Sequence, residues 1–113
     1  VAALAARGID VVAVCRTAPP APVVGVRYVL ADLFEPTAEL IAALSETDSL
    51  LHLAWQDGFV LQSRKHGEQL SSHYRFLMAA ADAGVRRIAV AGTMHEVGYW
   101  EGAVTADTPE NPQ

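Results

Sequence analysis

The chain has 113 residues, of which 51% are hydrophobic and 19% are charged, and its net charge is −5. This length suits one domain or one piece of a larger protein, and the composition excludes a disordered or low-complexity chain. The net negative charge and the scattered Lys and Arg residues argue against a nucleic-acid-binding surface, because phosphate binding needs clustered positive charge.

The N-terminal third predicts a helix end and two strands. Residues 1–8, VAALAARG, are typical of the last turns of a helix that ends at Gly8. Because the sequence begins inside this predicted helix, we expect the chain to be a fragment. Residues 9–16 and 26–32 are apolar and rich in β-branched side chains, which predicts buried strands. The proline-rich segment between them is too short for a helix, so we expect an irregular connection.

The remainder of the chain predicts two helices that alternate with two further strands. Residues 36–46 carry apolar side chains on one helical face, and Pro36 suits an early helical position. Residues 49–55 and 87–91 are short apolar runs typical of strands, and 67–83 repeat apolar residues at helical spacing before Gly84. Beyond Thr93 we expect an irregular segment.

The order of these elements predicts the fold class. Strands and helices alternate, and the four strands are continuously apolar, as strands buried on both faces of a parallel sheet are. The sequence therefore predicts an α/β protein with a doubly wound parallel sheet.

Candidate functional residues directly follow the predicted strands. Ligands of open parallel sheets bind beyond the carboxyl ends of the strands. The residue pairs at those ends are Cys15-Arg16, Asp32-Leu33, Ala54-Trp55 and Gly92-Thr93.

Each polar residue of this set has two interpretations. Arg16 either binds a phosphate, which suits its guanidinium, or is a solvated cation at a strand end. Asp32 either accepts a hydrogen bond from an exocyclic amine or caps the following turn. Thr93 either contacts a substrate oxygen or caps a loop.

Metal and thiol chemistry are not expected. His95-Glu96 lacks the second histidine that a helical zinc motif needs four residues on, where the sequence has Tyr99. His52 lies within an apolar strand, which favours a hydrogen-bonded core histidine over a ligand. Cys15, the single cysteine, excludes an internal disulfide, and its position favours packing over nucleophilic catalysis.

Taken in order, these segments resemble the extended short-chain dehydrogenase/reductase family, also called the NAD-dependent epimerase/dehydratase family. RGIDVVAVCR, VRYVLADLFE and SLLHLAW resemble its second, third and fourth strands, and LMAAADAGVRRIAVAGT resembles its long helix and fifth strand. ENPQ at the C-terminus resembles the segment that leads into its Tyr-x-x-x-Lys motif. Residues 1–113 would then form a partial NAD(P)-binding Rossmann domain of four strands that lacks the family's first, central strand.

The resemblance assigns roles to individual residues. Thr93 matches the catalytic hydroxyl that contacts the reacting sugar oxygen, and Met94 and His95 would lie on the substrate side. The positions that match the cofactor-binding segments are Arg16, Asp32, Leu33, Leu53, Ala54 and Trp55. The catalytic Tyr-x-x-x-Lys pair would come just after Gln113, and the glycine-rich phosphate-binding turn would precede Val1.

Two departures from the family pattern narrow this implied function. Members that prefer NAD carry an acidic residue at the end of the second strand, whereas this chain has Cys15 followed by Arg16, so we expect NADP in preference to NAD. The 4,6-dehydratases of the family have an acidic pair after the catalytic Thr, whereas this chain has Met94-His95, which argues against the elimination reaction of those enzymes. The resemblance therefore implies a fragment of an NAD(P)-dependent nucleotide-sugar epimerase or ketoreductase that transfers a hydride at a sugar carbon.

A non-catalytic NAD(P)-binding regulator on the same fold is the alternative function, and it would lack the Tyr-x-x-x-Lys pair. The expected partner is a nucleotide-activated sugar, with no nucleic acid and no membrane, and relatives suggest a homodimer through the helix at 67–83. No apolar run approaches the ~20 residues of a membrane helix, and no signal peptide is visible. We therefore expect a cytoplasmic protein.

Overall fold

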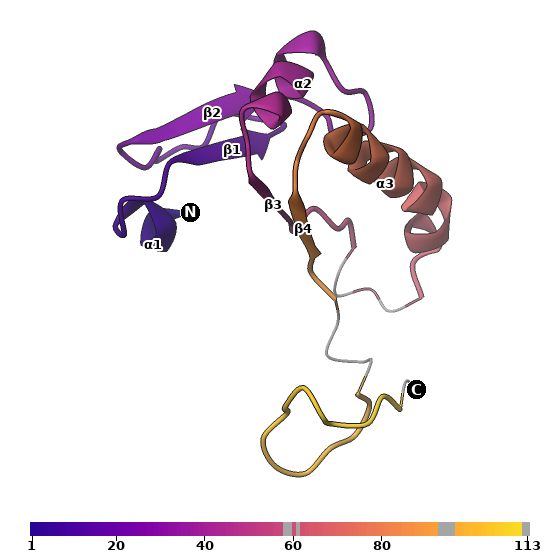
Figure 1. Cartoon of the computed structure of the whole chain (residues 1–113). Coiled ribbons are helices and arrows are strands. Elements are labelled where there is room, and N and C mark those ends of the chain that lie inside the picture. The colour runs from indigo at the N-terminus through magenta and orange to yellow at the C-terminus, as the bar shows by residue number, and fades with distance from the viewer. Residues whose placement is uncertain (58–59, 61, 93–96, 112–113) are drawn as a thin grey trace.

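The computed structural model describes residues 1–57, 60, 62–92 and 97–111 (Figure 1). Helices and strands alternate as the sequence predicts. The elements in chain order are α1 (Ala2–Ala5), β1 (Val11–Cys15), β2 (Val26–Leu30), α2 (Ala38–Ser45), β3 (Ser49–His52), α3 (Arg64–Asp82) and β4 (Arg87–Val90). The described part of the segment beyond Gly92 contains neither helix nor strand, also as predicted.

The strands form two parallel pairs. β1 pairs with β2 in the register Val11↔Val26, and β3 pairs with β4 in the register Ser49↔Arg87. The parallel arrangement and the irregular link between β1 and β2 confirm the predicted α/β class. The four strands do not form one sheet, however, because no hydrogen-bonded ladder joins β1 to β3 among the described residues.

Side-chain caps explain where the two longer helices begin. The Thr37 hydroxyl accepts a hydrogen bond from the Leu40 amide at 3.2 Å and caps α2. Pro36 therefore precedes the helix, and the prediction that it occupies an early helical position was wrong. Ser63 caps α3 in the same way, so this helix begins three residues before the predicted start at residue 67.

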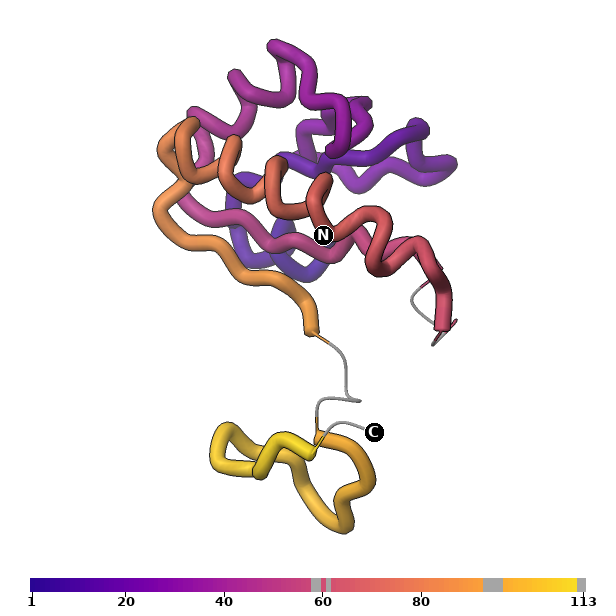
Figure 2. The backbone as a smooth tube through the Cα atoms, turned by 90° about the vertical axis from the view of Figure 1, so that its right-hand side faces the viewer, coloured from indigo at the N-terminus to yellow at the C-terminus, as the bar shows by residue number. Residues whose placement is uncertain are grey.

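A small core lies where α2 and α3 meet the strands. Its centre is Leu40 on α2 and Val29 on β2, which are 0% and 2% exposed, together with Phe76 and Ala80 on α3. Figure 2 shows α3 running alongside the β3–β4 pair. The apolar face predicted for residues 36–46 is confirmed at Leu40 and Leu44, both of which are buried.

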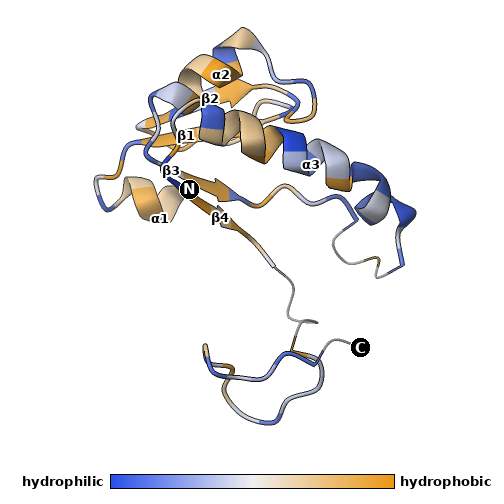
Figure 3. Cartoon of the chain, turned by 45° about the vertical axis from the view of Figure 1, so that its right-hand side comes forward, coloured by the Kyte–Doolittle hydropathy of each residue, from blue (hydrophilic) through white to orange (hydrophobic). Residues whose placement is uncertain are grey.

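Both faces of the strands were predicted to be buried, and this was wrong. β4 is exposed at all four residues and β1 is half-buried throughout. Figure 3 shows that the strands of both pairs are largely hydrophobic. A cleft of about 1450 Å³ is lined by residues of β1, β3 and β4. The total accessible surface is 8573 Å², against about 6,000 Å² for a compact protein of this mass.

The cleft lies where the family resemblance places an additional central strand. Apolar side chains of β1 and β3 face it, among them Val12 and Leu51, and Leu51 is 57% exposed.

Helix α3 is the only long helix of the described residues, and no helix among them is long and apolar enough to cross a membrane.

Candidate functional site

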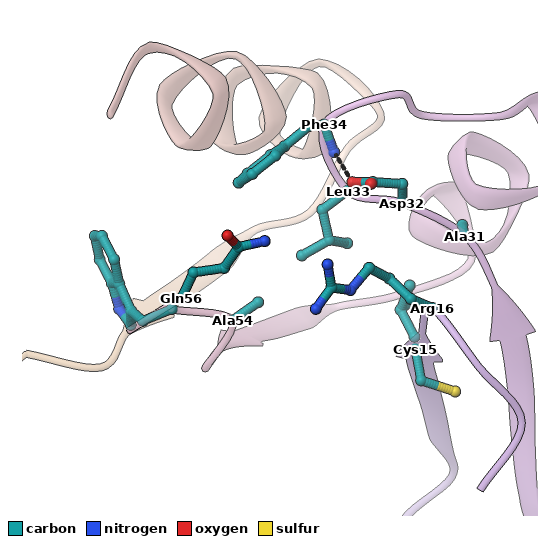
Figure 4. Close-up of a pocket in the computed structure, with 10 residues that line it drawn as sticks. Cys15, Arg16, Ala31, Asp32, Leu33, Phe34, Ala54 and Gln56 are labelled. Carbon is teal, nitrogen blue, oxygen red and sulfur yellow. Dashed lines mark hydrogen bonds between the residues drawn. The ribbon is translucent and has the colours of Figure 1, made fainter. Parts of the chain in front are cut away.

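A pocket of about 210 Å³ opens at the carboxyl ends of β1, β2 and β3. Its lining residues are the last two residues of β1 and residues that follow β1, β2 and β3, so the carboxyl ends of the three strands meet as the sequence predicts. They are Val14, Cys15, Arg16, Ala31, Asp32, Leu33, Phe34, Ala54, Trp55 and Gln56 (Figure 4). Five of the six predicted cofactor-binding residues are in this set.

Arg16 supplies the positive charge of the pocket. It follows the last residue of β1, and its guanidinium extends into the pocket towards Leu33 and Gln56 (Figure 4). Among the described residues no carboxylate lies within 4.0 Å of it, in contrast to Arg27 and Arg86, which form ion pairs. The guanidinium is therefore available to a phosphate or another anionic group.

Asp32 serves as a turn cap. Its Oδ1 accepts a hydrogen bond from the Phe34 amide at 2.9 Å, as the dashed line in Figure 4 marks. This Asx-type turn follows β2 and brings Phe34 to the pocket wall. The capping interpretation of Asp32 is therefore confirmed. Its second carboxylate oxygen can still accept hydrogen bonds from a ligand.

Trp55 is held at the opposite side of the pocket. Its indole Nε1 donates a hydrogen bond to the Ala91 carbonyl oxygen at 3.0 Å, and the Ala91 amide donates to the His52 carbonyl oxygen at 3.0 Å. These two bonds fix the indole across the ends of β3 and β4. The pocket is thereby tied to the strand end that leads, two residues later, to Thr93.

Gln56 and Phe34 line the pocket although the sequence reasoning missed both. Gln69 on α3 donates a hydrogen bond from Nε2 to the Gln56 Oε1 at 2.9 Å, and Figure 4 shows the Gln56 amide extending over the pocket. The signal available in the sequence was position alone, since both residues lie within four residues of a strand end. The bond to Gln69 spans 13 residues, which no local pattern reveals.

Leu53 was predicted to bind the cofactor, but it does not line the pocket. It faces the cleft between the strand pairs and is 64% exposed. Side chains alternate along extended backbone, so the burial of His52 turns Leu53 to another side. Thr93, Met94 and His95 lie outside the described residues, and their predicted roles stay predictions.

Two buried histidines, His52 and His73, lie behind Trp55 and Phe34, the aromatic residues of the pocket wall. His52 Nε2 and His73 Nδ1 are 2.9 Å apart, and the two residues are 2% and 3% exposed. Burial lowers the pKa of both imidazoles, and the neighbouring His73 lowers that of His52 further. The interpretation of His52 as a hydrogen-bonded core histidine is confirmed.

The described residues contain no group of three or more His, Cys, Asp or Glu side chains arranged to hold a metal ion. The polar groups of the pocket are one guanidinium, which donates, one amide, which donates and accepts, and one carboxylate, which accepts, between aromatic and aliphatic walls. Such a set suits a nucleotide, whose base packs on apolar walls while its phosphate and hydroxyl groups form hydrogen bonds. At about 210 Å³ the pocket accommodates only part of a dinucleotide.

Comparison with known proteins gives one informative match. The chain is 41% identical over 90 residues to the dTDP-6-deoxy-L-talose 4-dehydrogenase (NAD(+)) of Aggregatibacter actinomycetemcomitans. The match covers 79% of this chain and 33% of that protein, so the chain spans about a third of the relative's length. No protein-family model matches the chain. No solved structure matches it either.

Proposed function

We propose that this chain is part of an NAD(P)-dependent oxidoreductase of the extended short-chain dehydrogenase/reductase family that acts on a nucleotide-activated sugar. The observation that carries the proposal is the 41% identity over 90 residues to a dTDP-sugar dehydrogenase. The pocket supports it independently, because it gathers a guanidinium, an amide and a carboxylate that can hydrogen-bond a nucleotide at the carboxyl ends of three parallel strands.

The proposed cofactor site is the pocket around Arg16, Leu33 and Trp55. Its apolar walls would hold the adenine, and Arg16 would pair with a phosphate. The nicotinamide, when bound, supplies the hydride acceptor or donor. Thr93 would donate a hydrogen bond to the sugar oxygen whose carbon gains or loses the hydride, with Met94 and His95 on the substrate side.

We favour a dehydrogenase or ketoreductase over an epimerase. The relative's name describes a net oxidation at carbon 4 of a 6-deoxy sugar, and the same reaction in reverse is a ketone reduction. An epimerase would return the hydride to the same sugar and produce no net change in the nicotinamide. The absorbance of the reduced nicotinamide therefore separates the two activities in a single assay.

The cofactor preference is a finer part of the proposal. The relative's name specifies NAD(+), which gives no support to NADP. The preference for NADP rests on Arg16, which extends into the pocket without a carboxylate partner among the described residues. A ribose 2′-phosphate is the group that this guanidinium would distinguish.

The first test measures turnover by the protein's complete natural chain with dTDP-linked 4-keto and 4-hydroxy 6-deoxyhexoses. Thr93→Val should lower kcat by about 100-fold or more, because a preorganised hydrogen bond to the reacting oxygen is lost, whereas Thr93→Ser should stay within about tenfold. Nucleotide binding without turnover of any sugar would instead support the non-catalytic regulator. Absence of nucleotide binding would contradict both.

The second test addresses the cofactor. Arg16→Ala should raise the KM for NADP by about tenfold or more and leave the KM for NAD nearly unchanged, since only NADP carries the extra phosphate. Arg27→Ala is the matched control, because Arg27 lies on the neighbouring strand and pairs with Glu46 away from the pocket. Equal effects of Arg16→Ala on both cofactors would exclude the assignment of the 2′-phosphate to Arg16.

A further inference from the structure

The two aromatic walls of the pocket are packed against one buried histidine. The ring of His73 lies 4.4 Å from that of Trp55 and 4.8 Å from that of Phe34, between ring centroids. His73 belongs to α3, whereas Trp55 follows β3 and Phe34 follows β2. A single imidazole therefore contacts the walls contributed by two different strand ends.

His52 fixes the orientation of that imidazole. The 2.9 Å contact between His52 Nε2 and His73 Nδ1 requires one nitrogen to donate and the other to accept, so the two rings cannot both be protonated in this arrangement. His52 also lies 5.6 Å from Phe76 of the core, between ring centroids. The remaining ring nitrogen of His73, Nε2, is buried and has no hydrogen-bond partner among the described residues.

Protonation would disturb this arrangement. A first proton places a positive charge among apolar rings, at a site where the described part of the chain leaves one nitrogen without a partner and supplies no counter-charge. A second proton makes both facing nitrogens donors and breaks the hydrogen bond between the rings. Either change weakens the packing of His73 against Trp55 and Phe34.

The charged groups on the surrounding elements do not offset this effect. On the turn after β2, Asp32 caps Phe34 and Glu35 is exposed; before α3, Asp57 pairs with Ser63 and Lys65. On α3 itself the titratable and charged neighbours are Arg64, Lys65, His66, Glu68, Tyr74, Arg75 and Asp82, and all but the half-buried His66 are exposed. Among the described residues, His73 is the titratable group that lowers the pKa of His52 besides burial, and burial lowers the pKa of His73.

We propose that the His52–His73 pair positions Trp55 and Phe34 as walls of the nucleotide pocket, and that acid weakens nucleotide binding by protonating the pair. This inference deepens the proposed function and rests on it for the identity of the ligand. His52 and His73 are positioning residues, since neither lines the pocket. The neutral pair is the binding-competent form.

The experiment measures Trp55 fluorescence in the complete natural chain carrying Trp100→Phe, which leaves Trp55 as the reporter among the residues of this stretch. Without ligand, the Trp55 emission should titrate with pH, because a protonated imidazole stacked on an indole changes the emission of the indole. The midpoint should lie below pH 6.5, because burial lowers the pKa of both histidines. With NADP and NAD as probes, the Kd should rise by about fivefold or more between about pH 7.5 and about pH 5.5.

Two variants separate the pair from a general effect of acid. His73→Asn keeps a hydrogen-bonding group near the position of Nδ1 but does not titrate, so it should flatten both the emission titration and the pH dependence of Kd. His66→Gln is the matched control on the same helix, and it should leave both intact. Circular dichroism at each pH checks that the fold persists.

The outcomes distinguish failure of this inference from failure of the proposed function. A ligand-free titration that His73→Asn abolishes, without nucleotide binding at any pH, would retain the switch and reject the nucleotide. A pH-independent emission and Kd would overturn the inference, as would equal flattening by His66→Gln. Loss of binding that only tracks unfolding by circular dichroism would also overturn it.

Discussion

The indole nitrogen of Trp55 donates a hydrogen bond to the carbonyl oxygen of Ala91, 3.0 Å away, and so joins the loop after β3 to the end of β4. The bond spans 36 residues of sequence. Because Ala91 precedes the predicted catalytic Thr93 by two residues, this contact links the wall of the proposed nucleotide pocket to the segment proposed to carry the chemistry.

Trp55→Phe tests this link. The variant keeps an aromatic ring against His73 but removes the N–H donor, so it should cost about 1 kcal/mol of stability. If the proposed activity holds, it should also lower kcat/KM of the complete natural chain more than it weakens nucleotide binding, because the ring stays while the strand end loosens. Urea unfolding and steady-state kinetics measure the two effects. Equal losses in binding and turnover would contradict a link to the Thr93 segment.

Leu40→Ala tests the core between α2 and the strands. Leu40 is fully buried, so truncation should lower the free energy of unfolding by about 2–5 kcal/mol. Leu70→Ala is the control, because Leu70 on α3 is 62% exposed and should lose less than about 1 kcal/mol. Urea unfolding of the complete chain compares the two. Similar losses would mean that the core does not centre on Leu40.

The cap of α2 gives a further prediction. Thr37→Ala removes the hydroxyl that accepts the Leu40 amide, and it should cost about 1 kcal/mol of stability. Thr37→Ser retains the hydroxyl and should change stability by only a few tenths of that amount. Thermal unfolding by circular dichroism measures both variants, and a loss equal to that of Ala in the Ser variant would argue against the cap.

Stability should fall in mild acid because of the buried histidine pair. Both histidines have a pKa below the ordinary 6.5 in the folded chain, so between that value and the lower folded pKa the unfolded chain binds more protons. Their contribution is therefore complete above about pH 6.5 and is lost as the pH falls through the folded pKa values, by up to about 1.4 kcal/mol per pH unit for each proton.

Urea unfolding at a series of pH values checks this dependence. His73→Asn should reduce the slope below about pH 6.5, because one proton-uptake site of the unfolded chain is removed. His66→Gln should leave most of the slope in place, since His66 lies outside the buried pair. A slope that persists in full in the His73→Asn variant would assign the acid sensitivity to other groups.

The unfilled cleft predicts how residues 1–113 behave when produced by themselves. Within the described ranges, β1 and β3 each pair along one edge and leave the other on the cleft, where unpaired backbone groups and apolar side chains favour association. We expect marginal stability, aggregation or abnormal strand pairing. A cooperative thermal transition and monodisperse size-exclusion behaviour of this product would contradict the prediction.

The elements, and the gathering of the candidate residues at the carboxyl ends of the strands, could be predicted from the sequence alone. Its apolar runs and glycine breaks lie close together along the chain, so local periodicity is enough to predict four strands, the α3 helix and their parallel order. The placement of Arg16, Asp32 and Ala54 around one pocket followed, because parallel strands present their carboxyl ends at one edge.

The contacts between side chains of distant segments became visible in the three-dimensional fold and not before. The His52–His73 contact spans 21 residues, and the Gln56–Gln69 bond joins a loop to α3, so neither leaves a periodic signal in the sequence. The local sequence pattern could not predict how far the strands are buried either. An apolar strand is buried only where another element covers it, and the cleft beside β1 and β3 leaves that cover incomplete.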